Sequence, residues 1–256
     1  MPSISLVSIN IERDRHLDAL ADFFRMTDFD AVALQEVLEK DVPFFERILG
    51  MEAFFTPVCV RVDRPGMPPS IEGQALFAKH IELRNAEFYA GEYDTLWRHF
   101  SDTDIESIEN VAKAISYVDV NKNGCLFRVG TTHFTWSVKG ATSETQRKDI
   151  KRLVGKLETL GEFALVGDFN APRGGEIFTE LALKYKDNIP ETYEWSLDTS
   201  IHYAGRDRLE KDANALGLKG LMVDGLFTTP GYLAKNVQLH AGVSDHCAIA
   251  ATISKL

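Results

Sequence analysis

The stretch Leu165-Val166-Gly167-Asp168-Phe169-Asn170 is an apolar run that ends in a carboxylate and an amide two positions apart. Such a run predicts a strand that is covered on both faces, here over 163–168. In an extended segment, residues i and i+2 point to the same side. Asp168 could then accept a proton from a water while Asn170 donates a hydrogen bond to a phosphate oxygen. The alternative is an ordinary turn, because Asp and Asn both favour turns.

Two further apolar runs, far away in the chain, end in polar groups in the same way. They are Val32-Ala33-Leu34-Gln35-Glu36 and Val243-Ser244-Asp245-His246, and a predicted first strand over 3–11 carries Asn10. Strands that deliver these groups to one edge would build a site for Mg²⁺ or Mn²⁺, which prefer oxygen ligands. The sequence therefore indicates metal-assisted phosphoester cleavage. For Glu36, the alternative is a carboxylate exposed to water.

The triplet Ser244-Asp245-His246 does not indicate a serine hydrolase. Consecutive side chains cannot form the relay of nucleophile, base and orienting carboxylate, which is built from residues distant in sequence. Asp245 as a metal ligand and His246 as a contact to phosphate make better chemistry. Asp224 is a single charge inside the apolar run 221–227. Since a buried carboxylate needs a partner, His246 is the candidate, with a local Arg or Lys as the alternative.

His133 ends a predicted strand over 125–134. A lone histidine on a strand is more often structural, but its functional role would be to protonate the leaving oxygen. Glu72, which precedes a predicted strand, is the candidate for holding the ring of His133. Residues in loops on a rigid scaffold often contact substrate. Three residues in predicted loops are therefore candidates for substrate contacts: Trp136, His202 and Tyr203.

Strands and helices alternate first and hairpins follow, which predicts one α/β domain over 1–256 with sheets inside and helices outside. Asn121-Lys122-Asn123-Gly124 is a strong hairpin signal. Strands are expected at 3–11, 29–35, 54–62, 74–79, 114–120, 125–134, 163–168, 221–228, 236–241 and 247–254. Helices are expected at 15–26, 41–49, 143–160 and 174–185, with Asp14 and Thr142 as caps of the first and third. Long loops are expected at roughly 61–72, 91–105 and 187–219.

Composition narrows the class of protein. The chain has 256 residues and a net charge of −10, which weighs against a strong non-specific grip on long DNA. Its three cysteines are scattered without a C-x-x-C pair, which favours reduced thiols. The start shows no basic segment followed by an apolar stretch, and no apolar run approaches the roughly 18 residues that span a bilayer. We therefore expect a cytoplasmic protein with no membrane partner.

In this order and together, the motifs resemble those of the endonuclease/exonuclease/phosphatase (deoxyribonuclease I-like) superfamily over essentially the whole chain. The matching motifs are Ser8-Ile9-Asn10, Leu34-Gln35-Glu36, Glu72-Gly73, Thr132-His133, Gly167–Asn170, Asp224 and Ser244-Asp245-His246. Two segments depart from the family pattern. Ile11-Glu12-Arg13 stands where the family often has Asp or Gly, and Met222-Val223-Asp224-Gly225 replaces R-I-D-Y.

The resemblance implies a four-layer α/β/β/α sandwich in which two packed mixed sheets are flanked by helices. It implies a Mg²⁺ or Mn²⁺ site that includes Glu36, with Asn10 and Asp245 near the metal. It also implies that Asp168 and Asn170 position water and phosphate. In deoxyribonuclease I-like members, a histidine oriented by an aspartate contacts the phosphate and a histidine held by a glutamate acts on the leaving group. The pairs here are His246 with Asp224 and His133 with Glu72.

The expected function is a metal-dependent phosphoesterase, and more narrowly a nuclease or phosphodiesterase. Its partner would be a phosphoester substrate, with nucleic acid as one candidate. A phosphoinositide- or sphingomyelin-type phosphoesterase is an alternative, as is a catalytically silent binding protein. A silent protein should have lost one of Glu36, Asp168, Asn170 or His246, and all are present. A Rossmann-type oxidoreductase is disfavoured because no G-x-G-x-x-G follows the first strand.

Overall fold

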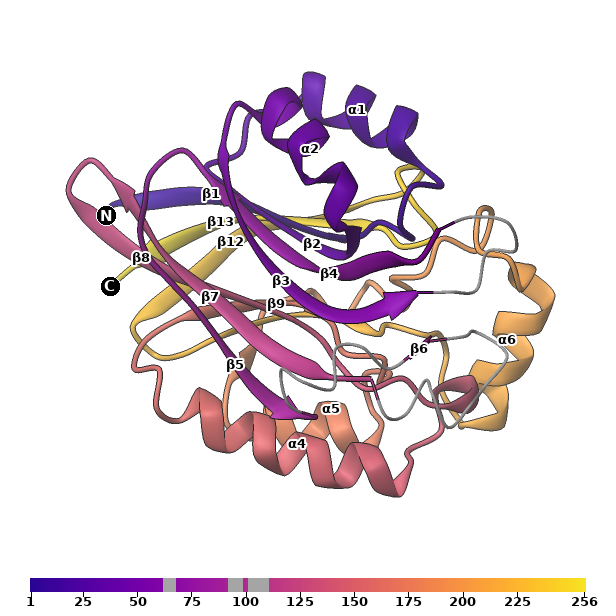
Figure 1. Cartoon of the computed structure of the whole chain (residues 1–256). Helices are drawn as coiled ribbons and strands as arrows, with labels where there is room; N and C mark the ends of the chain where they lie inside the picture. The colour runs from indigo at the N-terminus through magenta and orange to yellow at the C-terminus, as the bar shows by residue number, and fades with distance from the viewer. Residues whose placement is uncertain (62–67, 92–98, 101–110) are drawn as a thin grey trace.

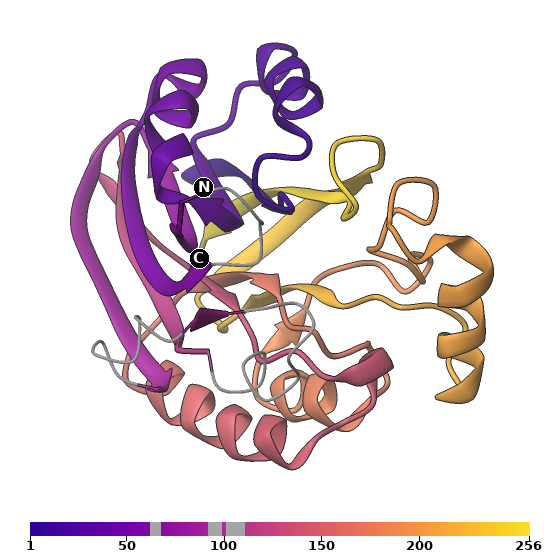
Figure 2. The same ribbon diagram turned by 45° about the vertical axis from the view of Figure 1, so that its right-hand side comes forward.

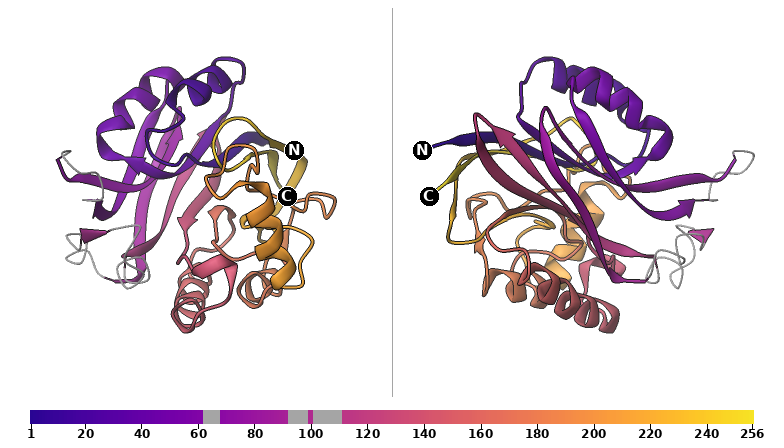
Figure 3. Two further views of the ribbon diagram at one scale, coloured as in Figure 1. Left: turned by 90° about the vertical axis from the view of Figure 1, so that its right-hand side faces the viewer. Right: turned by 60° about the vertical axis from the view of Figure 1, so that its left-hand side comes forward.

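The fold has four layers, with two mixed β-sheets packed face to face and helices outside each sheet (Figure 1). It is described by a computed structural model that covers residues 1–61, 68–91, 99–100 and 111–256. The sandwich is the predicted α/β/β/α architecture. Figure 3 shows from two sides that one pair of helices covers the first sheet and another pair covers the second.

The first sheet has seven strands. In sheet order they are β12 (Tyr232–His240), β13 (Ala248–Lys255), β1 (Ser3–Asn10), β2 (Ala31–Leu38), β4 (Ser70–Ala78), β3 (Glu52–Arg61) and β6 (His99–Phe100). Its outer face is covered by α1 (Leu17–Arg25) and α2 (Val42–Leu49). The β1–β2 and β3–β6 pairs are parallel, and the other pairs are antiparallel.

The second sheet has six strands. In sheet order they are β10 (Lys186–Asp187), β11 (Asp224–Thr228), β9 (Ala164–Asp168), β8 (Cys125–His133), β7 (Lys113–Lys122) and β5 (Ile81–Ala90). Its outer face is covered by α4 (Glu144–Leu157) and α5 (Glu176–Ala182). A further helix, α6 (Gly205–Ala215), lies apart from both outer layers (Figure 2).

The alternation of side chains along β1 shows how the sequence builds the layers. Ile4 and Leu6 belong to the core between the two sheets, whereas Val7 and Ile9 pack with the helices outside the first sheet. Since side chains alternate along a strand, even-numbered residues of β1 face the second sheet. The last of them is Asn10, which therefore reaches the second sheet at the end of β1.

Two buried glutamines tie the sheets together beneath these strand ends. The amide nitrogen of Gln35 donates to Ser8 Oγ at 3.2 Å and to Thr131 Oγ1 at 2.8 Å. The amide nitrogen of Gln74 donates to Ser116 Oγ at 2.7 Å and to the Thr131 carbonyl at 3.1 Å. Both amide nitrogens donate to groups of the second sheet, whereas the Gln35 amide oxygen has no hydrogen-bond partner among the described residues. The two glutamine side chains thus join the two sheets just below the candidate site.

Most predicted strands are present, and the hairpin signal is confirmed. β7 and β8 pair as far as Lys122 and Cys125, and the turn between them has positive φ at Asn123 (54°) and Gly124 (80°). The prediction of an unbroken loop over 187–219 is wrong, because α6 lies within it. Only Leu209 and Ala213 of α6 are buried, so its apolar face is too narrow to produce a clear helical period.

Other elements differ at their ends or were missed. β5 was not predicted, because it is an edge strand with mostly exposed or half-exposed side chains. β12 begins at Tyr232 rather than 236, and β4 begins at Ser70 rather than 74. The remaining expected loop residues at 62–67, 92–98 and 101–105 lie outside the described part of the chain.

Both predicted helix caps are wrong. α4 is capped by Ser143, whose hydroxyl accepts the N–H of Gln146 at 3.1 Å, while the Gln146 side chain returns to the Ser143 N–H at 3.3 Å. This capping box outcompetes Thr142 because both partners are satisfied at once. α1 begins without a side-chain cap, and Asp14 instead pairs with Lys40 at 3.0 Å. None of the described helices is long and apolar enough to cross a bilayer.

Candidate active site

Three predicted site residues stand side by side across the second sheet. In the register of β8, β9 and β11, His133 lies opposite Asp168 and Asp168 lies opposite Asp224. Each is at the end of its strand, so the row forms one edge of the sheet. Three motifs that are far apart in sequence, T-H, G-D-x-N and the isolated aspartate, are thus brought together by strand pairing.

The backbone around Asp168 explains the residues that flank it. Gly167 has a φ of 145°, and a Cβ there would lie 2.1 Å from the Thr132 carbonyl oxygen, so only glycine fits. Asn170 has a φ of 48°, and its N–H donates to Asp168 Oδ1 at 2.8 Å. The Asn170 side chain donates to the Phe134 carbonyl at 2.9 Å. The turn leaves Asp168 Oδ2 facing the other sheet.

Asn10 links the two sheets at this edge. Its amide nitrogen donates to Asp168 Oδ2 at 3.0 Å and to Glu36 Oε1 at 3.2 Å, and its amide oxygen accepts the Glu12 N–H at 3.2 Å. Asn10 was expected near a metal. In the structure its amide nitrogen orients two carboxylates, and its amide oxygen keeps a second lone pair beside the bond from Glu12.

A β-bulge aims Glu36 into the site. The pairing of β2 with β4 shifts register between Leu34 and Val37, and Glu36 has a φ of 57°. Glu36 Oε2 accepts a hydrogen bond from Arg13 Nη1 at 2.9 Å. Burial alone would raise the pKa of Glu36, but the charges of Arg13, His133 and Arg61 outweigh burial and lower it to about 2. Glu36 is therefore ionised at neutral pH.

Glu72 has a different partner from the expected one. It accepts a hydrogen bond from Arg61 Nη1 at 3.1 Å and lies 3.9 Å from Arg13 Nη1, and neither a hydrogen bond nor an ion pair joins it to His133. The reason is strand pairing. Arg61 is diagonal to Glu72 on the adjacent strand β3, where Cys59 is the direct neighbour of Glu72. Burial and the nearby Glu36 carboxylate raise the pKa of Glu72.

The predicted pair of Asp224 and His246 is present. His246 Nδ1 lies 2.7 Å from Asp224 Oδ2, and His246 Nε2 lies 3.8 Å from Asp168 Oδ2. Burial alone would lower the pKa of His246, but the carboxylates of Asp224, Asp168 and Asp245 outweigh burial and raise it well above its usual value. The raised pKa favours the protonated ring, and its Nε2 lies on the side of Asp168.

The pKa of His133 is shifted in the opposite direction from that of His246. Its Nε2 lies 3.5 Å from Asp168 Oδ2 and 4.0 Å from Glu36 Oε1. Burial and the charge of Lys113 lower the pKa of His133 to about 4, despite both carboxylates. A neutral ring at neutral pH does not suit the expected role of proton donor. It leaves one N–H that can donate a hydrogen bond to a leaving oxygen.

Lys113 is a site residue that the sequence did not reveal. It begins β7, is 6% exposed, and makes neither a hydrogen bond nor an ion pair with the described residues. Burial lowers the pKa of Lys113 below its usual value, although the nearby Cys59, Glu72, Asp168 and Glu36 oppose this. Its sequence signal was a lone charge in the apolar run 111–118, the same kind of signal that identified Asp224.

One group of potential metal ligands includes two residues that were not predicted, Glu12 and His16. Ligand atoms of Glu12, His16 and Asp245 all lie within 4.8 Å of one another. Burial, Glu36 and Glu12 raise the pKa of Asp245 to about 6, although His246 opposes this. Carboxylates that crowd together in this way favour a cation between them. Asp168, Asp224 and His246 form a second group of the same kind.

Comparison with solved structures decides the fold family. An endonuclease/exonuclease/phosphatase from Bacteroides vulgatus is similar with a TM-score of 0.69 and 18% identity over 100% of both chains. A mannosyl-6-phosphatase from Bacteroides thetaiotaomicron has a TM-score of 0.67 and 13% identity over 98% of this chain and 100% of that one. The human Nocturnin catalytic domain has a TM-score of 0.65 and 16% identity over 100% of this chain and 94% of that one.

The chain has the endonuclease/exonuclease/phosphatase fold. No protein-family model and no curated protein matches its sequence.

Within this fold, the residues predicted to contact substrate differ in how close they lie to the site and in how exposed they are. His202 lies near the site, because its N–H donates to the Asp198 carbonyl at 2.8 Å and the Asp198 N–H donates to the Asp245 carbonyl at 2.7 Å. Burial and the charge of His246 lower the pKa of His202 to about 4. Its ring stacks on Tyr203, with centroids 4.6 Å apart, and Tyr203 is 83% exposed. Trp136 is half-buried in the segment after β8.

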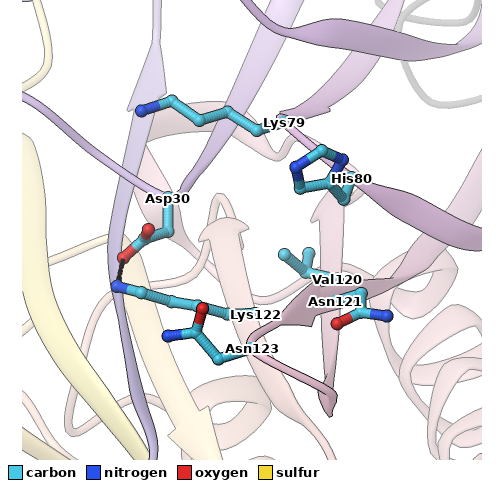
Figure 4. A pocket seen from close by; sticks show the side chains of 7 residues that line it. All are labelled: Asp30, Lys79, His80, Val120, Asn121, Lys122 and Asn123. Carbon is cyan, nitrogen blue, oxygen red and sulfur yellow. Dashed lines mark hydrogen bonds and ion pairs between the residues drawn. The ribbon is translucent and has the colours of Figure 1, made fainter.

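A separate cavity of about 130 Å³ lies at the other end of the sheets of this endonuclease/exonuclease/phosphatase fold (Figure 4). It is lined by residues at the start of β2 and the ends of β4 and β7. Its lysines are already paired, since Lys122 lies 2.6 Å from Asp30 and Lys79 lies 3.2 Å from Asp28. Among the described residues, the cavity therefore offers no free lysine for an anionic ligand. The candidate catalytic residues lie at the opposite edge of the sheets.

Proposed function

We propose that this protein is a metal-dependent phosphoesterase that cleaves a phosphoester with an activated water. The proposal rests on the groups that surround one oxygen of Asp168. Asp168 Oδ2 lies 3.0 Å from the Asn10 amide nitrogen, 3.5 Å from His133 Nε2 and 3.8 Å from His246 Nε2. One buried carboxylate thus faces an amide, a neutral imidazole and a charged imidazole at an edge where both sheets meet.

The donor set at this edge fits a divalent cation. Glu12 and Asp245 offer carboxylate oxygens and His16 offers a ring nitrogen, and all three are buried or half-buried. Glu36 lies close enough for its charge to raise the pKa of Asp245. Mg²⁺ and Mn²⁺ are held by one or a few carboxylates together with substrate oxygens. When bound, the cation would stabilise charge on the phosphate and make a water more acidic.

The protein's own residues supply the proton and phosphate contacts. Burial and Asp224 raise the pKa of Asp168 against the opposing charge of His246, so Asp168 becomes a better proton acceptor. It takes the proton of a water whose oxygen forms the new bond to phosphorus. His246, as an imidazolium oriented by Asp224, donates to a phosphate oxygen. The bond to the leaving oxygen breaks, and His133 donates a hydrogen bond to that oxygen. The oxygen then takes a proton from solvent, and Asp168 releases its proton to solvent.

Two further groups complete the phosphate site in this proposal. The Asn170 amide uses one N–H on the Phe134 carbonyl, which leaves the second for a phosphate oxygen. Lys113 supplies a buried ammonium without a partner among the described residues. A catalytically silent binding protein is disfavoured, because the residues that such a protein should have lost are present and His246, paired with Asp224, lies 3.8 Å from Asp168.

Nuclease or phosphodiesterase activity is the narrower proposal, with a nucleic-acid end as one substrate. The net charge of −10 disfavours a long duplex. Structures with the same fold include a mannosyl-6-phosphatase and the Nocturnin catalytic domain with a bound sulfate anion. Phosphomonoesters, phosphoinositides and sphingomyelin-type diesters are therefore the alternatives that a test must contain.

A hydrolysis panel tests the proposed function. The substrates are bis-p-nitrophenyl phosphate, p-nitrophenyl phosphate, single-stranded DNA, an abasic duplex, inositol phosphates and sphingomyelin, each with Mg²⁺ or Mn²⁺ and with EDTA. We expect hydrolysis of at least one phosphoester that depends on the cation. Activity that survives exhaustive chelation would contradict the metal requirement, and a complete lack of hydrolysis would favour the silent binding protein.

Replacing Lys113 by methionine should raise KM for the best substrate of that panel by roughly 10–100-fold, because a hydrogen bond to a charged group is worth about 1.5–3 kcal/mol. Methionine keeps the apolar stem, so the fold should persist. Lys122→Met is the matched control, since Lys122 ends the same strand and pairs with Asp30 at 2.6 Å. Equal KM values in wild type and Lys113→Met would remove Lys113 from the phosphate site.

A further inference from the structure

The candidate metal site contains a histidine, His16, beside the carboxylates of Glu12 and Asp245. His16 Nε2 lies 2.9 Å from Glu12 Oε2, and a ligand atom of Asp245 lies within 4.8 Å of both. Glu12 and Asp245 are 9% and 6% exposed, and the His16 side chain is 19% exposed. The site is therefore shielded, yet it is reached from solvent on the side of the imidazole.

An unusual backbone conformation brings Glu12 and His16 together. Glu12 and Arg13 have φ values of 46° and 67°, in the left-handed region that residues other than glycine rarely adopt. Such a conformation persists only when the surrounding structure fixes it, and it is common at functional sites. This turn follows β1 directly and returns the chain so that His16, just before α1, faces the Glu12 carboxylate.

All the carboxylates at this edge have partners, and these include Glu12 and Asp245, which accepts from Ser244 Oγ at 3.1 Å. Glu36 accepts from Arg13 at 2.9 Å and from Asn10 at 3.2 Å. Asp224 is bound to His246 Nδ1 at 2.7 Å. Glu12 also pairs with Arg15 through Oε1, but the Arg15 side chain is 50% exposed, and Oε2 is the oxygen that faces His16.

We propose that His16 is a nitrogen ligand of the cation held by Glu12 and Asp245, and that it makes the site prefer transition-metal dications to Mg²⁺. This inference rests on the proposed function for the presence of a metal, and it adds the ligand type and the metal class. Mg²⁺ demands oxygen ligands in a near-ideal octahedron and retains its waters. Imidazole binds first-row transition-metal dications more readily, so one ring nitrogen shifts the preference toward them.

Pulsed electron paramagnetic resonance of the protein with substoichiometric Mn²⁺ tests the ligand directly. We expect the wild type to show ¹⁴N coupling from one directly bound imidazole, and His16→Ala to lose it. His80→Ala is the matched control, because His80 is an exposed histidine at the other end of the sheets. Coupling should persist in that control.

Calorimetric titration with the metals alone measures the preference. His16→Ala should weaken Mn²⁺ binding by roughly 10–100-fold, a range typical of losing a group that supports a metal site, and should weaken Mg²⁺ binding far less. His16→Gln restores an oxygen donor of similar reach. It should bind Mg²⁺ at least as well as the wild type but show no nitrogen coupling, and it replaces His16→Ala if that variant does not fold.

Mn²⁺ bound to the wild type without ¹⁴N coupling, or with the same coupling in His16→Ala, would overturn the inference and reduce His16 to a hydrogen-bond partner of Glu12. Hydrolysis could still occur in that case, so the proposed function would stand. Nitrogen-coupled Mn²⁺ in a protein that cleaves no phosphoester would support the inference while rejecting the proposed function. Failure of both Mn²⁺ and Mg²⁺ to bind would reject the inference together with the metal requirement.

Discussion

Asp168→Asn is expected to lower kcat by roughly 10²–10⁴-fold, the usual contribution of a general base, while the inhibition constant for inorganic phosphate stays nearly unchanged. An amide of the same shape cannot accept the proton of the attacking water. Its oxygen can still accept the Asn170 N–H, which lies 2.8 Å from Asp168 Oδ1. Steady-state kinetics with the best phosphoester, together with phosphate inhibition, separates the loss of turnover from a loss of binding.

The matched control for this change is Asp187→Asn. Asp187 is half-buried, but it lies on β10 and forms an ion pair with Arg173 at 2.8 Å, away from the row of His133, Asp168 and Asp224. Its replacement should alter stability and leave kcat intact. A near-normal rate for purified Asp168→Asn would assign the base role to another group. Equal losses in both variants would indicate a general effect of removing a buried carboxylate.

Strand ends explain why much of the site could be predicted from the sequence. Asp168, Glu36 and His246 each follow an apolar run, and parallel or neighbouring strands bring such ends to one edge. The partner of Asp224 could also be predicted, because a lone charge in a buried strand must be paired and His246 was the available group. The structure confirms this pair at 2.7 Å.

The partner of Glu72 could not be predicted in the same way. The sequence does not show which strand lies beside β4, and that neighbour, β3, supplies Arg61 rather than His133. Lys113 was missed although its pattern was the same as that of Asp224. The contacts of Glu12 and His16 depend on two left-handed residues in succession, and no glycine marks that turn in the sequence.

The α/β fold class could be predicted from the alternation of strands and helices along the sequence. The least regular elements of the fold, α6 and β5, could not. α6 has only two buried residues, Leu209 and Ala213, and the rest of its sequence is polar or small. β5 lies at an edge, so its side chains lack the alternation of a half-buried strand. In both cases tertiary contacts decide the structure, and local pattern carries little of that information.

His246→Ala is expected to lower kcat/KM by roughly 10²–10³-fold, as for loss of one donor to the charge that develops in the transition state. Asp224→Asn should lower kcat/KM by a large part of the same factor, because Asp224 orients the His246 ring and keeps it charged. Groups that act as a unit are not additive. The double variant should therefore be barely slower than His246→Ala. Strictly multiplicative losses would show that the two residues act independently.

The pH dependence gives the same pair a second and independent test. The folded pKa of His246 is raised well above its ordinary value of 6.5, with burial opposing and Asp224 as the largest favourable cause. The pair therefore stabilises the fold fully below pH 6.5, and this contribution fades only as pH rises through the raised folded pKa. In Asp224→Asn, burial dominates and the ring loses its proton at lower pH. The alkaline limb of kcat/KM should then move to lower pH.

Nuclear magnetic resonance of the His246 ring, assigned by its absence in His246→Ala, follows the same proton without substrate. The wild-type ring should remain charged through neutral pH, and the Asp224→Asn ring should titrate below it. A merely structural aspartate would lower the melting temperature in Asp224→Asn but leave both titrations in place. An unchanged ring titration in a folded Asp224→Asn variant would therefore remove Asp224 from the proposed mechanism, since the 2.7 Å contact would then hold the ring without setting its charge.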